Sequence, residues 1–195
     1  MVTTTRKRQP PQYHHGDLRQ ALIDVGEVLL DEGGPEAVAL REAARRLGVT
    51  AAAVYRHFAD RESLLSELAV RGFDAFGQAL HHAAAGAADP LAAMAHAYVR
   101  FAVARPGRFR LMFGPAVADR SRHPALQQAV ERASIGFRGA AAGTTPDERS
   151  LAMLRAWSMI HGLSHLLIDG MLPGQDPELL VRVLTKSPPL PKQPD

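Results

Sequence analysis

The sequence lacks cysteine altogether, and aromatic residues, with a single tryptophan, make up only 6% of its 195 residues. Without cysteine there are no disulfide bonds and no thiolate metal ligands, and this absence is compatible with a reducing compartment. No apolar run reaches the roughly 18 residues of a membrane-spanning helix. The polar, basic residues 1–8 do not resemble a secretory signal. We therefore expect a cytoplasmic protein without a membrane partner.

Catalytic motifs are also missing. The sequence has no Gly-x-Ser-x-Gly, no phosphate-binding loop, no dinucleotide-binding glycine motif and no His-Glu-x-x-His. His161 and His165, at positions i and i+4, could share a metal ion, but no third ligand is spaced to complete the site. The sequence thus predicts no enzyme activity, no cofactor and no metal site.

The N-terminal third of the sequence lacks an excess of positive charge. The formal net charge is +3, which is a mild indication of an anionic partner. Residues 1–62, however, carry nine Lys or Arg and nine Asp or Glu. An anionic partner must therefore be recognised through the directions in which the charges point, because their sum is zero in this segment.

What is present is a nearly unbroken series of helical patterns. Apolar residues recur at spacings of three and four, no segment alternates with a period of two, and pairs of glycine and proline separate the segments. We predict an all-α fold of about nine helices. The N-terminal part, 14–62, is expected to be a three-helix helix-turn-helix domain, and 63–186 an antiparallel helical bundle. The basic arm 1–13 and the proline-rich tail 187–195 are expected to be disordered.

Residues 40–58 have the pattern of a helix-turn-helix. Two short helices are joined by a three-residue turn in which Gly48 suits a positive φ. Thr50 lies at the N-terminal end of the second helix, where free N–H groups and the helix dipole favour a phosphate. The residues that can pack the second helix on the first are Leu47, Val54 and Phe58, and those left on the outer side are Ala52, Ala53, Tyr55 and Arg56. A plain helical hairpin without a DNA role shares this pattern.

The stretch from Tyr13 to Leu65, with its YRHF-x-D-R-E-x-L-L run, resembles the DNA-binding domain of the tetracycline-repressor (TetR) family. The resemblance implies that the helix from Ala51 lies in the major groove and that Tyr55, His57 and Arg61 contact phosphates. Packing roles for Tyr55 and His57 remain open as alternatives. The predicted DNA-contacting residues are Arg41, Thr50, Ala51, Ala52, Ala53, Tyr55, Arg56, His57 and Arg61.

The sequence departs from this family in two places. Ala39 stands where a Ser or Thr usually caps the second helix, a loss of about 1 kcal/mol in stability. The helix expected in the groove opens with three alanines, 51–53, which can touch a thymine methyl group but cannot form hydrogen bonds to bases. Base discrimination is therefore expected from Arg56, Thr50, DNA shape and the basic arm 6–8 in a minor groove. The alternative for the arm is an unspecific solvated tail.

Residues 98–114 and 157–162 resemble the WHG-type C-terminal domain of the same family, with Trp157, His161 and Gly162 at the signature spacing. We expect this domain to bind a small molecule, because apolar side chains with a few polar groups are typical of ligand sites. A core role is the alternative for each candidate. The candidate walls are Met94, Tyr98, Phe101, Met112, Phe113, Phe137, Trp157 and His161.

The helix expected from Pro146 to about Asp169 is apolar on two faces, so it must be covered on two sides. One face can meet its own domain, and the other can meet a second subunit across a two-fold axis, together with the last helix. A core helix in a monomer is the alternative. The predicted interface residues are Met153, Ile160, Leu163, Leu167, Leu180 and Leu184.

With the resemblance, these features predict a homodimeric transcriptional regulator. We expect a repressor that binds a near-palindromic operator in double-stranded DNA and is released by an unknown small-molecule effector. The alternative is a helical protein-interaction module without sequence-specific DNA binding. Only DNA binding through phosphates requires an affinity that falls steeply with salt.

Overall fold

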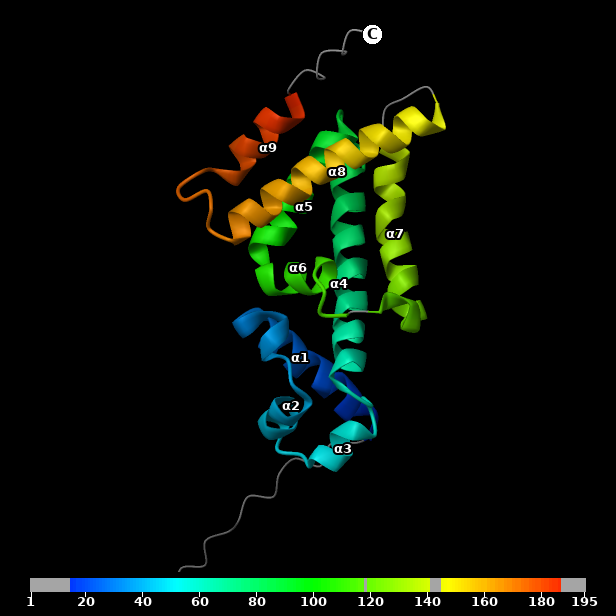
Figure 1. Ribbon diagram of the computed structural model, residues 1–195, viewed down its shortest axis with the longest axis vertical. Helices are drawn as coiled ribbons and strands as arrows, with labels where there is room; N and C mark the ends of the chain where they lie inside the picture. The colour runs from blue at the N-terminus through cyan, green and yellow to red at the C-terminus, as the bar shows by residue number, and fades with distance from the viewer. Residues whose placement is uncertain (1–14, 118, 141–144, 187–195) are drawn as a thin grey trace, which may run out of the picture.

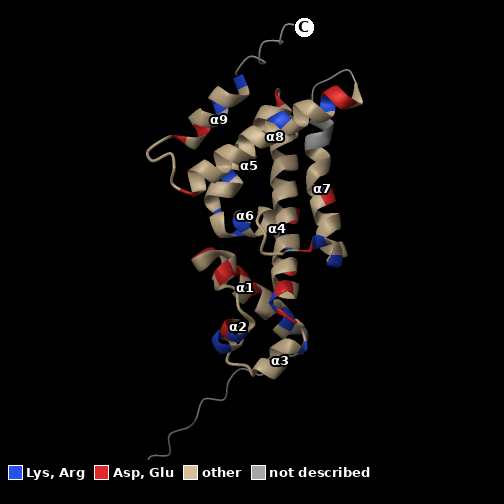
Figure 2. Ribbon diagram, viewed as in Figure 1, with Lys and Arg blue, Asp and Glu red and all other residues tan. Residues whose placement is uncertain are grey.

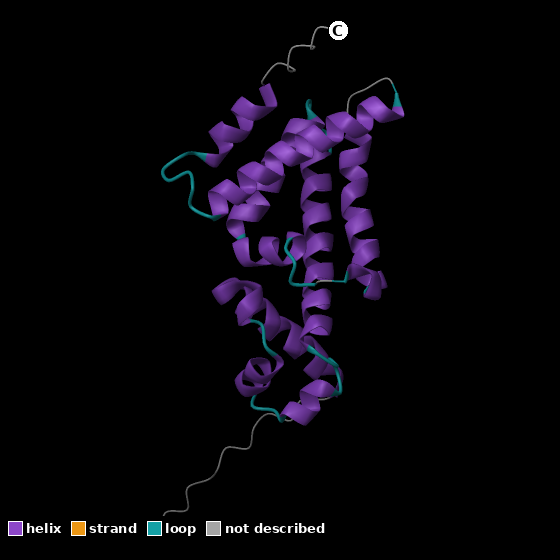
Figure 3. Ribbon diagram, viewed as in Figure 1, coloured by secondary structure: helices purple, strands orange, loops and turns teal. Residues whose placement is uncertain are grey.

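The computed structural model describes residues 15–117, 119–140 and 145–186, except for the side chains of 15–17 and 137–140. Within this part the chain forms nine α-helices and no strand, which confirms the predicted all-α class (Figures 1 and 3). The arm 1–13 and the tail 187–195 lie outside the described residues. The helices are α1 His15–Ala37, α2 Leu40–Leu47, α3 Ala51–Tyr55, α4 Arg61–Ala84, α5 Pro90–Ala104, α6 Pro106–Phe113, α7 Pro124–Ala140, α8 Pro146–Ile168 and α9 Pro177–Lys186, with a 3-10 turn at Arg120–Arg122.

Two helix ends show how the local sequence acts. A pair of glycines is a typical helix stop, and the helical backbone of α1 is interrupted at Gly33-Gly34 before one further turn leads to Ala37. Gly34 has a φ of +72°, a backbone conformation that glycine adopts without steric cost. α3 ends at Tyr55, and residues 56–57 form a turn from which the chain leads towards α4.

α4 joins the two halves of the molecule. It runs from α1–α3 at one end of the structure to α5–α9 at the other (Figure 1). Its first turns bury Leu64 and Leu68, and its later turns bury Phe76 and Leu80. The buried side chains of both halves form one continuous hydrophobic cluster. A shift of α4 would therefore be felt in both halves.

A second connection runs from α6 to α1. Gly107, near the start of α6, lies so close to α1 that a Cβ atom added there would be 2.1 Å from the Leu30 carbonyl oxygen. Next to it, the buried Arg108 pairs with Glu27 of α1 at 3.2 Å. The two helices are thus in direct backbone contact and are also joined by a partly buried ion pair.

Candidate DNA-binding surface and effector cavity

The turn between α2 and α3 has the geometry that its sequence predicts. Gly48 has a φ of +67°, and its N–H group donates back to carbonyl groups of the last turn of α2. Val54 of α3 and Phe58 just after it are buried against the N-terminal core, and Leu47 packs beside them. The packing predicted for these three side chains is confirmed, and it fixes which side of α3 faces outward.

The outward side of α3 carries the predicted base-reading residues. Ala51, Ala52 and Arg56 are exposed, and Tyr55 has 48% of its surface exposed. Ala53 and His57 are half-buried. This arrangement leaves Tyr55 and Arg56 free of the core, so the packing alternative for Tyr55 has no support in the structure.

Thr50 acts as the N-cap of α3. Its side-chain oxygen accepts a hydrogen bond from the Ala53 N–H group at 3.2 Å. The hydroxyl group is exposed and can still donate to a phosphate or a base edge. Thr50 therefore both stabilises the short helix and presents a donor at its N-terminal end.

The N-terminus of α2 opens into a depression of about 320 Å³ that three predicted DNA-contacting residues, Arg41, Tyr55 and Arg61, help to line. Ala39, at the N-cap position, provides no side-chain hydrogen bond to the first turn of α2. The N–H groups of that turn, the helix dipole and Arg41 therefore favour an anion here, while the carboxylate of Asp60, which also lines the depression, accepts a hydrogen bond from the Ser63 N–H group.

Arg61 is less free than the sequence suggests. Its Nε donates to the Val38 carbonyl at 2.7 Å, and its Nη2 donates to the Pro35 carbonyl at 2.5 Å. These bonds hold the α1–α2 connection against the start of α4. Arg61 thus has a structural role, and a phosphate contact would have to use its remaining N–H groups.

The other arginines of α2 are neutralised by neighbouring carboxylates. Arg45 and Arg46 both bond to Glu42, and Arg46 also bonds to Glu32 of α1. The hydrogen bonds from Arg45 and Arg46 lower the pKa of Glu42 to about 2. Figure 2 shows the resulting mixture of both signs on α2. Arg41, on the exposed side of the same helix, has no carboxylate partner among the described residues.

A small cavity of about 220 Å³ lies in the C-terminal half, between α4, α5, α6, α7 and α8. No charged side chain lines it. Three of its walls, Tyr98, Phe113 and Trp157, are among the predicted ligand-binding residues. The lining residues are Phe73, Phe76, Tyr98, Phe113, Val130, Ala133, Ser134, Met153 and Trp157.

The polar groups at this cavity are hydrogen-bonded to one another. The Tyr98 hydroxyl accepts from Trp157 Nε1 at 3.2 Å and lies 2.8 Å from His161 Nδ1. Burial raises the pKa of Tyr98, and burial followed by the charge of nearby His165 lowers the pKa of His161. A neutral tyrosine therefore lies within hydrogen-bond distance of a neutral imidazole, and the tautomer of His161 decides which of the two donates.

The other predicted wall residues lie elsewhere. Met94 and Met112 are buried core side chains, and Phe101 lines a different hollow. His161 does not line the cavity itself but lies behind three of its walls, in contact with Tyr98, Phe113 and Trp157. The Phe137 side chain lies outside the described residues.

Sequence reasoning missed the contribution of α4 to the cavity, and from α7 it named Phe137 but not Val130, Ala133 or Ser134. Phe73 and Phe76 are spaced by three and continue the buried stripe of α4. Their aromatic rings pack edge-on against Phe113, with centroids 5.4 and 5.9 Å apart. The continuation of the apolar stripe of α4 into the C-terminal half was the signal that could have identified these two residues.

The predicted dimer residues fall into several environments. Ile160 and Leu163 are buried within a single subunit, so they have no surface left for a partner. Met153 lines the cavity. Leu167, Leu180 and Leu184 are half-buried. The large apolar side chains that α8 and α9 do expose are Leu151, Leu154, Trp157, Met159, Leu166, Leu179 and Val183.

His161 and His165 pack edge-on against each other, with ring centroids 4.7 Å apart. Among the described residues, however, no group of three or more His, Asp or Glu side chains is arranged to hold a metal ion. The geometry favours a ring contact beneath the cavity, where His165 also packs edge-on against Phe109.

Two family profiles match the sequence. The profile described as bacterial regulatory proteins, tetR family, matches residues 22–68. The profile described as tetracyclin repressor-like, C-terminal domain, matches residues 91–187. The first covers α2, α3 and parts of α1 and α4, and the second covers nearly all of α5 and all of α6–α9.

Individual proteins agree with the profiles. The HTH-type transcriptional regulator Rv1816 of Mycobacterium tuberculosis is 28% identical over 173 residues, which cover 85% of this chain and 72% of that protein. A solved structure of a protein with unknown function from Rhodococcus sp. RHA1 is 32% identical, covers 90% of this chain and 95% of the other, and superposes with a TM-score of 0.76. A bacterial regulatory protein in the tetR family from Rhodococcus RHA1 is 21% identical, covers 88% of this chain and 93% of the other, and shares the fold with a TM-score of 0.60.

Proposed function

This chain belongs to the TetR family of DNA-binding transcriptional regulators, and from that membership we propose that it is a homodimeric repressor released from a near-palindromic operator by a small, neutral, apolar effector. The observation that carries the proposal is the outward side of α3, where Tyr55 and Arg56 are exposed beside an uncapped α2 N-terminus. Regulators of this family act by binding DNA, and we propose no enzyme activity.

DNA recognition would use two kinds of contact. α3 enters the major groove, where Arg56 reads a base edge and the methyl groups of Ala51 and Ala52 touch thymine methyls. A phosphate occupies the depression at the start of α2, where Arg41 and Tyr55 complete its surroundings. Because alanines cannot form hydrogen bonds to bases, much of the base preference would come from Arg56 and from DNA shape.

The effector would occupy the 220 Å³ cavity. Burying an ionised group without a partner is costly, and no charged side chain lines this cavity, so the occupant is neutral. Aromatic walls favour a flat ring. Tyr98 can exchange one of its internal hydrogen bonds for a polar atom of the effector.

The signal would travel through α6. Phe113, at the end of this helix, forms a wall of the cavity, and Gly107, near its start, touches α1. An effector that displaces Phe113 would tilt α6, move α1 and change the spacing of the two DNA-binding halves. A tenfold release needs a difference of only about 1.4 kcal/mol in effector affinity between the two states.

A second copy of the chain would cover the exposed apolar side chains of α8 and α9. These side chains are a large apolar surface for a soluble protein, and a two-fold axis would bring the same face of each subunit together. Ile160 and Leu163 are left out of this interface because their own subunit already covers them. The proposed contacts are Leu151, Leu154, Met159, Leu166, Leu179 and Val183.

α8 is long enough and apolar enough, by length and composition alone, to cross a membrane. One such helix is weak evidence for a membrane protein, and coverage by a second subunit explains its composition equally well. We therefore propose a cytoplasmic location without a membrane partner.

The test is selection of bound sites from random duplex DNA at low ionic strength. We expect a near-palindrome whose half-sites are about 34 Å apart, and an affinity that falls linearly as log K against log salt. The operator complex is then titrated with neutral and ionised bicyclic aromatics, and the neutral compounds alone should release the DNA. If no duplex is enriched, the DNA-binding proposal is wrong; if DNA is bound but no neutral compound releases it, the effector proposal is wrong.

A further inference from the structure

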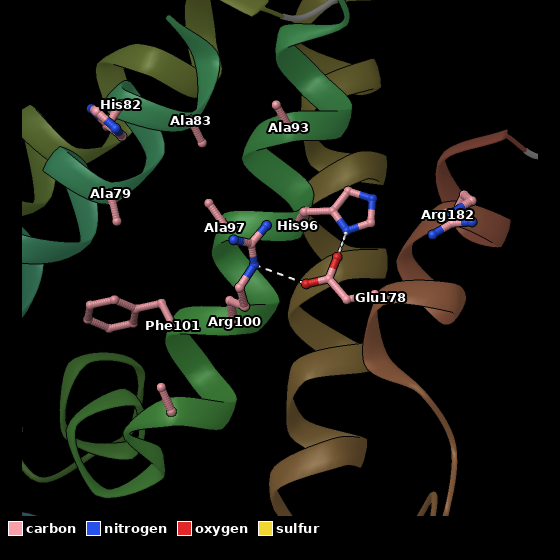
Figure 4. Close-up of a pocket in the computed structure, with 11 residues that line it drawn as sticks. Ala79, His82, Ala83, Ala93, His96, Ala97, Arg100, Phe101, Glu178 and Arg182 are labelled. Carbon is pink, nitrogen blue, oxygen red and sulfur yellow. Dashed lines mark ion pairs between the residues drawn. The ribbon is translucent and has the colours of Figure 1, made fainter. Parts of the chain in front are cut away.

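A second hollow lies between α4, α5 and α9 (Figure 4) and shares no lining residue with the effector cavity. It is an open groove of about 820 Å³. Methyl groups form much of its lining, from Ala79 and Ala83 of α4 and from Ala93, Ala97 and Ala104 of α5. From the first to the last of the α5 alanines the helix rises about 16 Å, so the apolar floor is long as well as wide.

The rim of the groove is charged. Glu178 of α9 reaches over α5, where its carboxylate lies 3.0 Å from Arg100 Nε and 2.5 Å from His96 Nδ1 (Figure 4). Arg182, one turn further along α9, also lines the groove and has no ion-pair partner among the described residues. The Arg100 guanidinium and the His96 imidazole thus face a single carboxylate above a floor of methyl groups, and Arg182 adds a further positive charge to the lining from α9.

We propose that this groove binds an amphipathic carboxylate, an unbranched apolar chain with one carboxylate at its end, and that Glu178 occupies the position of the ligand carboxylate in the free protein. Arginine is well suited to bind a carboxylate through two parallel hydrogen bonds. The Arg100 side chain is 71% exposed and that of Glu178 43%, and ion pairs with such exposure are weak enough to be exchanged. The chain of the ligand lies along the alanine floor.

Exchange of the carboxylate has a consequence for α9. Glu178 is the second residue of α9 and precedes Leu179, one of the exposed apolar residues proposed for the dimer interface. A ligand that takes Arg100 and His96 from Glu178 releases the first turn of α9 from α5. The groove is therefore a second place at which a small molecule can act on the dimer, independent of the effector cavity.

The experiment measures binding of labelled decanoate to the full chain by equilibrium dialysis, without DNA and below the concentration at which decanoate forms micelles. Glu178→Gln should bind decanoate about two- to fivefold more tightly, because an exposed competing charge is removed. Arg100→Gln and Arg182→Gln should each bind it about two- to fivefold more weakly. Arg122→Gln, which removes an exposed charge from the 3-10 turn after α6, is the matched control and should bind like the wild type.

Decanol and a chain-length series test the two halves of the ligand separately. Binding of decanol should not respond to the Glu178 or Arg100 changes. Each methylene added between octanoate and decanoate should raise affinity about twofold, half of the roughly fourfold effect of full burial. Ala97→Leu, which fills the floor and leaves the charges in place, should weaken decanoate and decanol alike. Circular dichroism verifies that each variant is folded.

Two results would overturn this proposal. One is an affinity for decanoate that is the same in Glu178→Gln, Arg100→Gln and the control, or too weak to detect in all of them. The other is binding that quenches the fluorescence of Trp157, the single tryptophan, which lines the effector cavity and not the groove. Neither result bears on DNA binding or on release by neutral aromatics.

Discussion

Replacement of Gly107 by alanine tests the contact between α6 and α1. A Cβ atom at this position would lie 2.1 Å from the Leu30 carbonyl oxygen and 3.2 Å from Gly34 Cα. These are backbone atoms, so no side chain can rotate away to relieve the clash. Since real Cβ contacts essentially never fall below 3.0 Å, the two helices must separate by about 0.9 Å.

The separation should reduce both stability and DNA affinity. Forcing extra volume into a packed interface costs about 1–3 kcal/mol, which lowers the melting temperature by about 2–4 °C per kcal/mol in a chain of this size. α1 supports the helices of the DNA-binding half, so the same displacement imitates the movement proposed for the effector. We expect the effector-free variant to bind the operator at least about fivefold more weakly, the lower end of common coupling energies.

Gly136→Ala in α7 is the matched control. The nearest atom to an added Cβ atom there is Met94 Sδ at 3.8 Å, an ordinary contact, and alanine favours a helix over glycine by about 0.5–1 kcal/mol. Urea unfolding followed by Trp157 fluorescence, at one fixed protein concentration, and anisotropy of labelled operator provide the two measurements. The reasoning is refuted if Gly107→Ala unfolds at the same urea concentration as the control and retains wild-type DNA affinity.

Four further predictions address charge and assembly. Arg41→Gln should weaken binding to every duplex and flatten the slope of log K against log salt by about one; an unchanged slope would remove Arg41 from the phosphate contacts. Arg61→Ala should lower the free energy of unfolding by about 1–3 kcal/mol, because two carbonyl groups lose their donor. The pKa of His161 is lowered in the folded state, so the unfolded state binds more protons below about pH 6.5. The free energy of unfolding should therefore fall as the pH drops below that value, by at most about 1.4 kcal/mol per pH unit. In urea unfolding curves, His161→Asn should show a smaller fall than the wild type. Leu154→Glu should sediment as a folded monomer, because it places a charge on the exposed face of α8, whereas Leu163→Glu should unfold the subunit, because it buries a charge in the core. If Leu154→Glu remains dimeric, the interface lies elsewhere.

The class of the fold and the helix-turn-helix were predictable because their signals are local. Gly48 needs a positive φ, and Val54 and Phe58 must be buried, which together fix the turn and the orientation of α3. The spacing of apolar residues was sufficient for the nine helices. The interruption of α1 at Gly33-Gly34 was predictable from the two glycines, but the further turn to Ala37 was not, because a chain that resumes a helix after two glycines has the same pattern as one that ends there.

The cavity and the interface were harder to predict because they depend on which of two apolar faces turns inward. α8 is apolar on both faces, and its sequence does not say that Ile160 and Leu163 pack on α5 and its neighbours while Leu154 and Met159 face outward. Periodicity therefore identified the helix but not its rotation. Arg61 illustrates the same limit, since no pattern reveals that its guanidinium bonds to carbonyl groups more than twenty residues away.

The alanines at the start of α3 explain why the position of this helix would have to be precise for the proposed DNA recognition. In the proposed complex Ala51 and Ala52 would present only methyl groups to a base, and a methyl contact loses about a quarter to a half of its dispersion energy over a gap of about 0.5–1 Å. A surface with several hydrogen bonds to bases could tolerate such a displacement through adjustable side chains, but this one cannot. We therefore expect a movement of α6 comparable to the 0.9 Å that one Cβ atom at Gly107 would impose to weaken the proposed recognition, and on this proposal an occupant of a small cavity would be able to control DNA binding.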